Sequence, residues 1–193
     1  MAAGLAEPDR RVTIVEPKAT WPTEFEAIAT SLREALGPLA IRIDHIGSTA
    51  VPGLPAKDII DVQVTVAALD RDRLLPALAR AGFVDQGIAA DHRPPGAGGP
   101  DDDWRKLLFK PRTGRPVNLH VRVAGRPNQR YPLLFRDYLR AHPESAAAYA
   151  VLKRALAALG IDREVYADVK DPACDLIFIA ALAWASQTRR AGR

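Results

Sequence analysis

One stretch of the sequence, residues 45–66, constrains the fold more than any other. Its middle, residues 47–57, is rich in small residues and prolines, which is typical of a tight loop. The segment that follows alternates strictly between apolar and polar side chains, which predicts a β-strand with one buried face. The apolar face carries Ile60, Val62, Val64 and Val66, and the polar face carries Asp61, Gln63 and Thr65. The chain must therefore fold around a sheet that needs neighbouring strands and a covering layer.

Other segments supply those partners. Alternation predicts strands at residues 41–46, 83–88, 104–110 and 117–123, the last with Asn118, His120 and Arg122 on its polar face. Helices are predicted from Pro22 to the Gly37-Pro38 stop and from the Asp70 cap to Gly82. Three more follow at residues 129–141, 143–159 and 171–187.

These elements predict the α+β class, with a short mixed sheet backed by helices and a helical C-terminal part. The length of 193 residues favours one domain, because domains have roughly 150 residues. We expect an α/β core at about 10–125, a helical subdomain at about 126–188 and a basic tail at 189–193.

Composition excludes several classes of protein. The single cysteine, Cys174, excludes an internal disulfide and a zinc site built on several thiolates, and we expect it to be buried and inert. The net charge of +4 includes the arginines of the basic tail, so it does not indicate nucleic-acid binding. No apolar run reaches the ~20 residues of a membrane span, and charged residues occupy the N-terminus, so we expect a cytoplasmic protein. Phosphate-loop, GxSxG and HExxH motifs are absent from the sequence.

One constellation carries chemistry. Gly47-Ser48 ends a predicted strand, and Asp61 begins the polar face of the next one after twelve intervening residues. A Gly-Ser turn lets backbone N–H groups approach a phosphate, and a carboxylate on the adjacent strand can hold a divalent metal that bridges phosphate oxygens. Asp61 and Gln63 could instead belong to an ordinary solvated strand face.

The full run of residues 45–61, HIGSTAVPGLPAKDIID, resembles the GrpB family. The likeness continues through Trp104-Arg105-Lys106, Asn118-Leu119-His120-Val121, residues 135–139, Leu152-Lys153, and Tyr166 with Lys170. The resemblance implies a nucleotidyltransferase-like fold and a nucleotide or other phosphorylated small molecule as ligand. The sequence also resembles the GrpB-like domain that is fused C-terminal to dephospho-CoA kinase in actinobacteria, where this domain is an accessory region.

The resemblance assigns roles to individual residues. Gly47, Ser48, Lys57 and Lys106 would bind phosphate, and Asp61, Gln63 and His120 would form the catalytic group. The superfamily has a second carboxylate where this chain has Gln63, so two-magnesium catalysis lacks anionic ligands. We therefore expect at most a single divalent ion, Mg or Mn, on Asp61 and His120, with Gln63 orienting a water or a ligand.

Several further residues have two interpretations. His45 is in phase with apolar neighbours, which favours a structural histidine bonded under the loop. Lys106 is preferred over Arg105 as the residue facing Asp61, because the two lie on opposite strand faces. His92 and the acidic run at residues 101–103 indicate a mobile loop or a lid, and Tyr166 with Lys170 could reach a nucleotide or form a surface pair.

Two functions remain open from the sequence. One is a transferase in which the Gly-Ser turn holds a nucleotide and Asp61 a metal. The other is a non-catalytic ligand-binding or accessory module that keeps the same cleft. Gln63 favours the module, and the retained Gly-Ser turn, Asp61 and lysines favour the transferase; the sequence predicts no oligomeric state.

Overall fold

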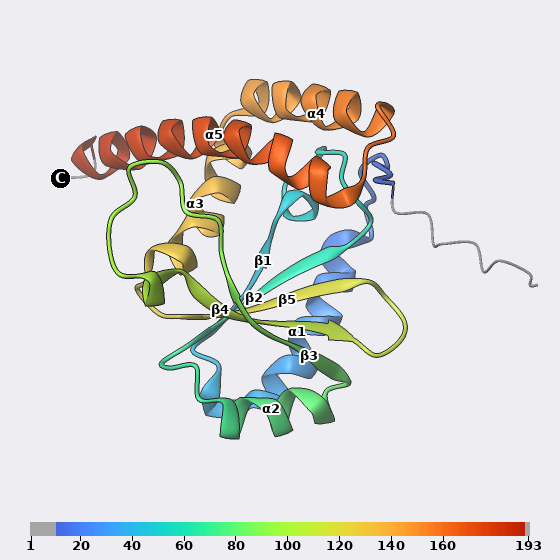
Figure 1. Ribbon diagram of the computed structural model, residues 1–193, viewed down its shortest axis with the longest axis vertical. Helices are drawn as coiled ribbons and strands as arrows, with labels where there is room; N and C mark the ends of the chain where they lie inside the picture. Colours follow the sequence, from blue (N-terminus) through green and yellow to red (C-terminus); the bar gives the residue numbers. More distant parts are fainter. Residues whose placement is uncertain (1–10, 192–193) are drawn as a thin grey trace, which may run out of the picture.

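The computed structural model describes residues 11–191 and contains one mixed five-stranded sheet (Figure 1). The strands are β1 (Arg42–Ile46), β2 (Ile60–Val66), β3 (Phe83–Ala90), β4 (Arg105–Pro111) and β5 (Val117–Val123), in the order β1-β2-β5-β4-β3. The central pair, β2 and β5, is parallel, and the other neighbouring pairs are antiparallel. The short mixed sheet that the sequence predicts is confirmed.

The apolar face of the sheet packs on two helices, α1 (Trp21–Leu36) and α2 (Arg71–Arg80). Ile60, Val62 and Val64 are fully buried there. Leu32 of α1 and Leu78 of α2 are equally buried in the same core. The alternation along β2 thus gives one face to this core and leaves Asp61 and Gln63 on the other.

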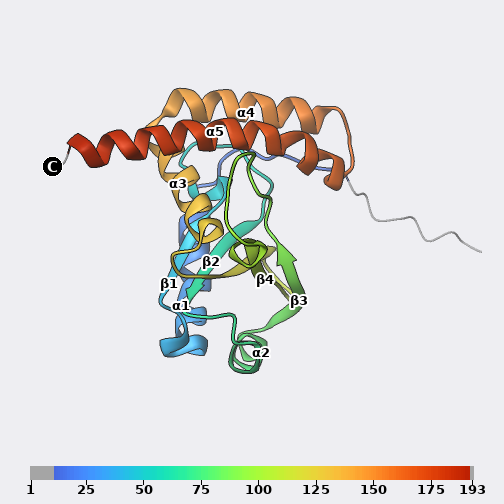
Figure 2. The ribbon, with the colours of Figure 1, turned by 60° about the vertical axis from the view of Figure 1, so that its left-hand side comes forward.

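Three helices complete the chain: α3 (Pro127–Ala141), α4 (Pro143–Ala158) and α5 (Arg163–Ala191). Both ribbon views show α4 and α5 side by side across one end of the sheet, with α3 running from them along the sheet (Figures 1 and 2). Val51 and Leu54 of the loop after β1 pack in a second core with Leu139, Tyr149 and Cys174. This loop is therefore held between the sheet and the helices, and the helical C-terminal part is confirmed.

The last helix is longer than the predicted segment 171–187. It starts directly after Asp162, whose side chain accepts a hydrogen bond from the backbone N–H of Glu164 at 2.8 Å. Pro172 lies inside the helix rather than in its first turn. The two turns before the proline carry the buried ring of Tyr166, which packs with Val12 and Leu156. The side chains of the predicted basic tail lie outside the described residues.

Candidate functional site

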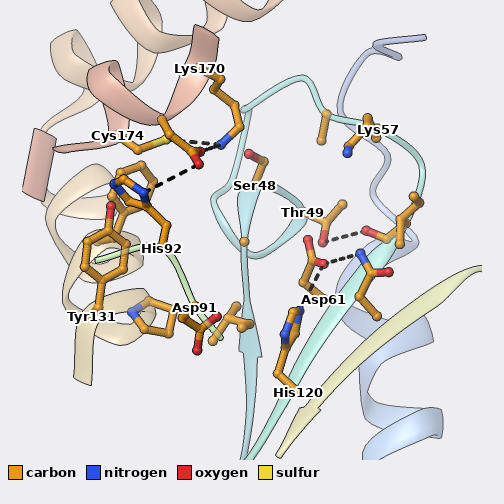
Figure 3. A pocket seen from close by; sticks show the side chains of 18 of the residues that line it. Ser48, Thr49, Lys57, Asp61, Asp91, His92, His120, Tyr131, Lys170 and Cys174 are labelled. Carbon is orange, nitrogen blue, oxygen red and sulfur yellow. Dashed lines mark hydrogen bonds and ion pairs between the residues drawn. The ribbon is translucent and has the colours of Figure 1, made fainter. Parts of the chain in front are cut away.

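A cavity of about 310 Å³ lies between the loop after β1, the polar face of the sheet and the C-terminal helices. It brings together five residues that the sequence predicts for the site: Gly47, Ser48, Lys57, Asp61 and His120. Figure 3 shows Lys57 and Tyr131 on opposite sides of Ser48, with Lys170 reaching in from α5. The Gly-Ser turn, the aspartate strand and the histidine strand therefore meet in one place.

Gly47 is required by its surroundings. Its φ of 70° lies in the left-handed region, where side chains with a Cβ are strained. A Cβ at this position would lie 2.4 Å from Oδ2 of Asp61. The glycine thus allows the turn backbone to press against the carboxylate of the neighbouring strand.

Two arginines of α3 hold the carbonyl groups that flank this turn. Arg136 donates to the backbone oxygen of His45 at 2.8 Å, and Arg140 donates twice to that of Ala50, at 2.9 and 2.7 Å. The hydroxyl of Thr49 meets Nε2 of His45 at 2.9 Å, and the His45 ring stacks on Phe25 with centroids 4.7 Å apart. Burial lowers the pKa of His45 to about 4, so this histidine is neutral. His45 has the structural role that the sequence favours.

Lys153 of α4 reaches the turn from the opposite side. Its ammonium group donates to Oγ of Ser48 at 2.9 Å and to the backbone oxygen of Pro55, and it lies 4.7 Å from the ring centroid of Tyr149. Burial, and after it the charge of Lys170, lower the pKa of Lys153 to about 7. With this pKa, Lys153 is partly protonated at neutral pH, and its charged form meets neutral oxygens and an aromatic ring in these contacts.

Asp61 faces the cavity with 27% of its side chain exposed. Its Oδ1 accepts a hydrogen bond from Asn118 at 2.8 Å and lies 3.9 Å from Nε2 of His120. Burial alone would raise the pKa of Asp61, but the contacts with His120, Asn118 and Lys57 outweigh it and hold the pKa below its ordinary value. Asp61 is thus a carboxylate at neutral pH.

His120 is neutral. Burial and the adjacent Arg122 lower its pKa to about 4, against the opposing effect of Asp61. Nη2 of Arg122 lies 3.5 Å from Nδ1 of His120, so Nδ1 is the acceptor and Nε2 carries the proton toward Asp61. A metal on Nε2 would need the other tautomer, with its Nδ1 proton directed at a guanidinium. Within residues 11–191, no group of three or more histidine, cysteine, aspartate or glutamate side chains is arranged to hold a metal ion.

Gln63 does not orient a ligand. Its side chain is completely buried beneath α3, where Nε2 donates to the backbone oxygen of Gln129 at 3.0 Å and Oε1 accepts from Arg122 at 2.8 Å. The expectation that it faces a ligand or water is wrong, because α3 covers this part of the polar strand face. Its amide supplies both a donor and an acceptor to that network, which a carboxylate would not.

Lys106 lies on the sheet face predicted for it but pairs with Asp91, just after β3, rather than lining the cavity. Asp91 also accepts from Arg122 at 2.8 Å and from Asn128 at 3.1 Å. Despite burial, these cations hold the pKa of Asp91 well below its ordinary value. Asp91 and Asn128 were not predicted as site residues. β3 extends two residues beyond the predicted strand, to Ala90, and this extension places Asp91 at the end of the strand.

For the remaining predicted residues, the structure shows which ones line the cavity and which ones have a structural role. Tyr166 is 2% exposed and lines the cavity with Lys170, so these two residues do not form a surface pair. The ammonium of Lys57 lies 5.8 Å from the ring centroid of Tyr166. His92 is fixed to α5 by Asp175 at 3.0 Å. Cys174 is buried as predicted, and its sulfur meets Lys170 at 3.3 Å.

Comparison with known proteins identifies the family of this chain. The family model described as GrpB protein matches residues 11–179. The chain is a member of the GrpB family. The crystal structure of conserved protein GrpB from Enterococcus faecalis superimposes with a TM-score of 0.73 at 29% identity, over 90% of this chain and 99% of that one. This confirms the α+β fold of the family, which the sequence predicted as nucleotidyltransferase-like.

Two curated relatives show how the domain occurs elsewhere. A dephospho-CoA kinase of Mycolicibacterium paratuberculosis is 37% identical over 92% of this chain, and the match spans 47% of that protein. The UPF0157 protein PA4798 of Pseudomonas aeruginosa is 34% identical over 91% of this chain and 69% of its own length. The chain thus spans less than half of the kinase-named relative. None of the helices in the described part of the chain is long and apolar enough to cross a membrane.

Proposed function

We propose that this GrpB protein binds a phosphorylated small molecule, with nucleotides as the first candidates, and that the phosphate lies against the Gly47-Ser48 turn. The observation that carries the proposal is Lys153, a buried cation held against Ser48 by neutral partners. A buried charge without a counterion is costly, and an anionic ligand relieves that cost. Lys57 and Lys170 line the same cavity and add positive charge near the phosphate.

The same geometry favours a binding or accessory module over a two-metal transferase. Three aspartates line the cavity: Asp61 lies beside His120, Asp91 is neutralised by Lys106 and Arg122, and Asp171 pairs with Lys170 at 3.2 Å. Two divalent ions need more anionic oxygens than this arrangement offers. The relatives named dephospho-CoA kinase support an accessory role, and we propose a cytoplasmic location for it.

Metal-dependent nucleotidyl transfer is the second candidate. It is favoured by the partly exposed, ionised carboxylate of Asp61 beside the phosphate turn. In that case Asp61 would hold one Mg²⁺ or Mn²⁺, which would neutralise phosphate oxygens, and His120 would have to change tautomer to join it.

The test is calorimetric titration of the chain with nucleoside mono- and triphosphates, CoA and dephospho-CoA, each with and without Mg²⁺ or Mn²⁺. We expect metal-independent binding of one phosphorylated class, weakened by about 10- to 100-fold in Lys153→Gln, because a charge-assisted hydrogen bond is worth about 1.5–3 kcal/mol. The matched control is Lys110→Gln, which removes the same charge from an exposed position on β4 outside the cavity.

Three outcomes separate the candidates. Equal affinities in Lys153→Gln and Lys110→Gln would contradict phosphate binding at the turn. Binding that requires a divalent ion and is lost in Asp61→Asn would favour the transferase. Binding that ignores both the metal and Asp61→Asn would support the module.

A further inference from the structure

Two residues that line the cavity on the Asp91 side, away from Lys57, each carry a buried polar atom without a hydrogen-bond partner in the structure. Nε1 of Trp104 and Oδ1 of Asn128 are both fully buried atoms of this kind. Their residues are 4% and 1% exposed, and both line the cavity. Unpaired buried polar groups are rare in folded proteins because each loses its hydrogen bond to water. One of these two is a donor and the other an acceptor.

The orientation of the Asn128 amide follows from its other contacts. Its Nδ2 donates to Oδ2 of Asp91 at 3.1 Å and to the backbone oxygen of Arg105 at 2.9 Å. Both partners are acceptors, so the nitrogen must face them and the oxygen is the atom left unpaired. Trp104 is held in place at its backbone, whose oxygen accepts from the N–H of Asp91 at 2.8 Å. Asp91 thus positions both residues.

We propose that Trp104 and Asn128 recognise a planar amide-type group of the ligand, such as the edge of a nucleobase or a carboxamide. This inference rests on the proposed function, because it assigns the phosphate of the same ligand to the Lys153 end. A nucleobase edge and a carboxamide both present an acceptor for the Trp104 N–H and a donor for the Asn128 oxygen. The cavity volume of about 310 Å³ is at the small end of the usual range for ligand sites, which suits a mononucleotide.

Trp104→Phe is the sharpest variant, because it removes the unpaired N–H, keeps an aromatic ring and breaks none of the hydrogen bonds described for the protein. The probes are AMP, UMP, nicotinamide mononucleotide and ribose 5-phosphate, measured by calorimetric titration. We expect the best of the first three to bind at least about tenfold more tightly than ribose 5-phosphate, which has no planar group. Trp104→Phe should reduce that advantage about three- to tenfold and leave ribose 5-phosphate binding unchanged, the value of one hydrogen bond.

A spectroscopic measurement gives an independent answer. The sequence has three tryptophans, so the indole N–H signals in a ¹H–¹⁵N spectrum are few, and Trp104→Phe identifies one of them. We expect this signal to move on saturation with the best base- or amide-bearing probe and to stay in place with ribose 5-phosphate. The preferred probe distinguishes a nucleobase from a carboxamide.

The failures are distinguishable. If ribose 5-phosphate and the nucleotides bind equally, or Trp104→Phe weakens both to the same extent, the recognition role is wrong while phosphate binding stands. If all four probes fail to bind, or bind equally well to Lys153→Gln, the proposed function itself is wrong.

Discussion

Two buried lysines near opposite ends of the cavity differ in the charge of their partners. Lys106 is 12% exposed and lies against the carboxylate of Asp91, which Arg122 shares. Lys153 is 2% exposed, and its ammonium meets the hydroxyl of Ser48 and a backbone carbonyl. One end balances its charges within the protein, and the other leaves a positive charge for something else to balance. The difference supports the proposal that the Asp91 end is scaffold and that the Lys153 end binds an anion.

The largest expected effect concerns the scaffold. Asp91→Asn removes the shared counterion and leaves Lys106 and Arg122 buried without it, so we expect a loss of about 3–5 kcal/mol in the free energy of unfolding. Urea denaturation measures this loss. Lys153→Gln, by contrast, should keep the wild-type stability or raise it, because it removes an uncompensated buried charge. Equal losses in the free energy of unfolding of the two variants would contradict the distinction between the two ends.

Gly47→Ala tests how the Lys153 end is positioned. The new Cβ meets Asp61 in a strained backbone conformation, so we expect a loss of about 2–4 kcal/mol in the free energy of unfolding. Part of this loss comes from the clash and should be absent when the change is made in an Asp61→Ala background. A double-mutant cycle in urea measures that part, and a coupling near zero would contradict the close approach.

Gln63→Glu sharpens the assignment of the Asp91 end. The glutamate could still accept from Arg122 but could not donate to the carbonyl of Gln129, so we expect a loss of about 1–3 kcal/mol and no gain in metal affinity. Unfolding with and without Mg²⁺ checks both. A stabilising response to Mg²⁺ in this variant alone would show that the position reaches the ligand site.

The most gradual effect is a pH dependence of stability at the Lys153 end. Its folded-state pKa of about 7 lies below the ordinary value of 10.5, so between these values the unfolded chain binds a proton that the folded chain has lost. The free energy of unfolding, compared with that of Lys153→Gln, should therefore rise with pH from 7 to 9, by up to about 1.4 kcal/mol per unit. Affinity for a phosphate ester should fall over the same range, because the cation is lost. Parallel profiles in wild type and variant would contradict the assignment.

The fold was largely predictable from the sequence because its signals are local. The alternation along β2 and the glycine and proline stops marked each strand and most helices. The Gly47-Ser48 turn and Asp61 were predictable because one continuous motif carries both. The start of α5 was missed because its first turns are held by distant residues, such as Val12, which packs with Tyr166.

The rest of the site depends on pairings across the chain. Asp91 and Lys106 are fifteen residues apart, and Ser48 and Lys153 are 105 apart. No sequence periodicity or motif predicts either contact. Gln63 shows the same limit, since a polar residue on a strand face predicts solvent or ligand until the position of α3 is known. Register and tertiary packing decided these residues, and neither can be derived from one sequence.

The wall of the cavity is divided between the sheet, with its loop, and the helices α3, α4 and α5. An occupant that touches Ser48 and Lys153 together would join two segments that are far apart in sequence and add its binding energy to their contact. The amide protons of α4 and α5 should then exchange with solvent more slowly in the bound protein. The proposed ligand would thus also stabilise the packing of the C-terminal helices against the sheet.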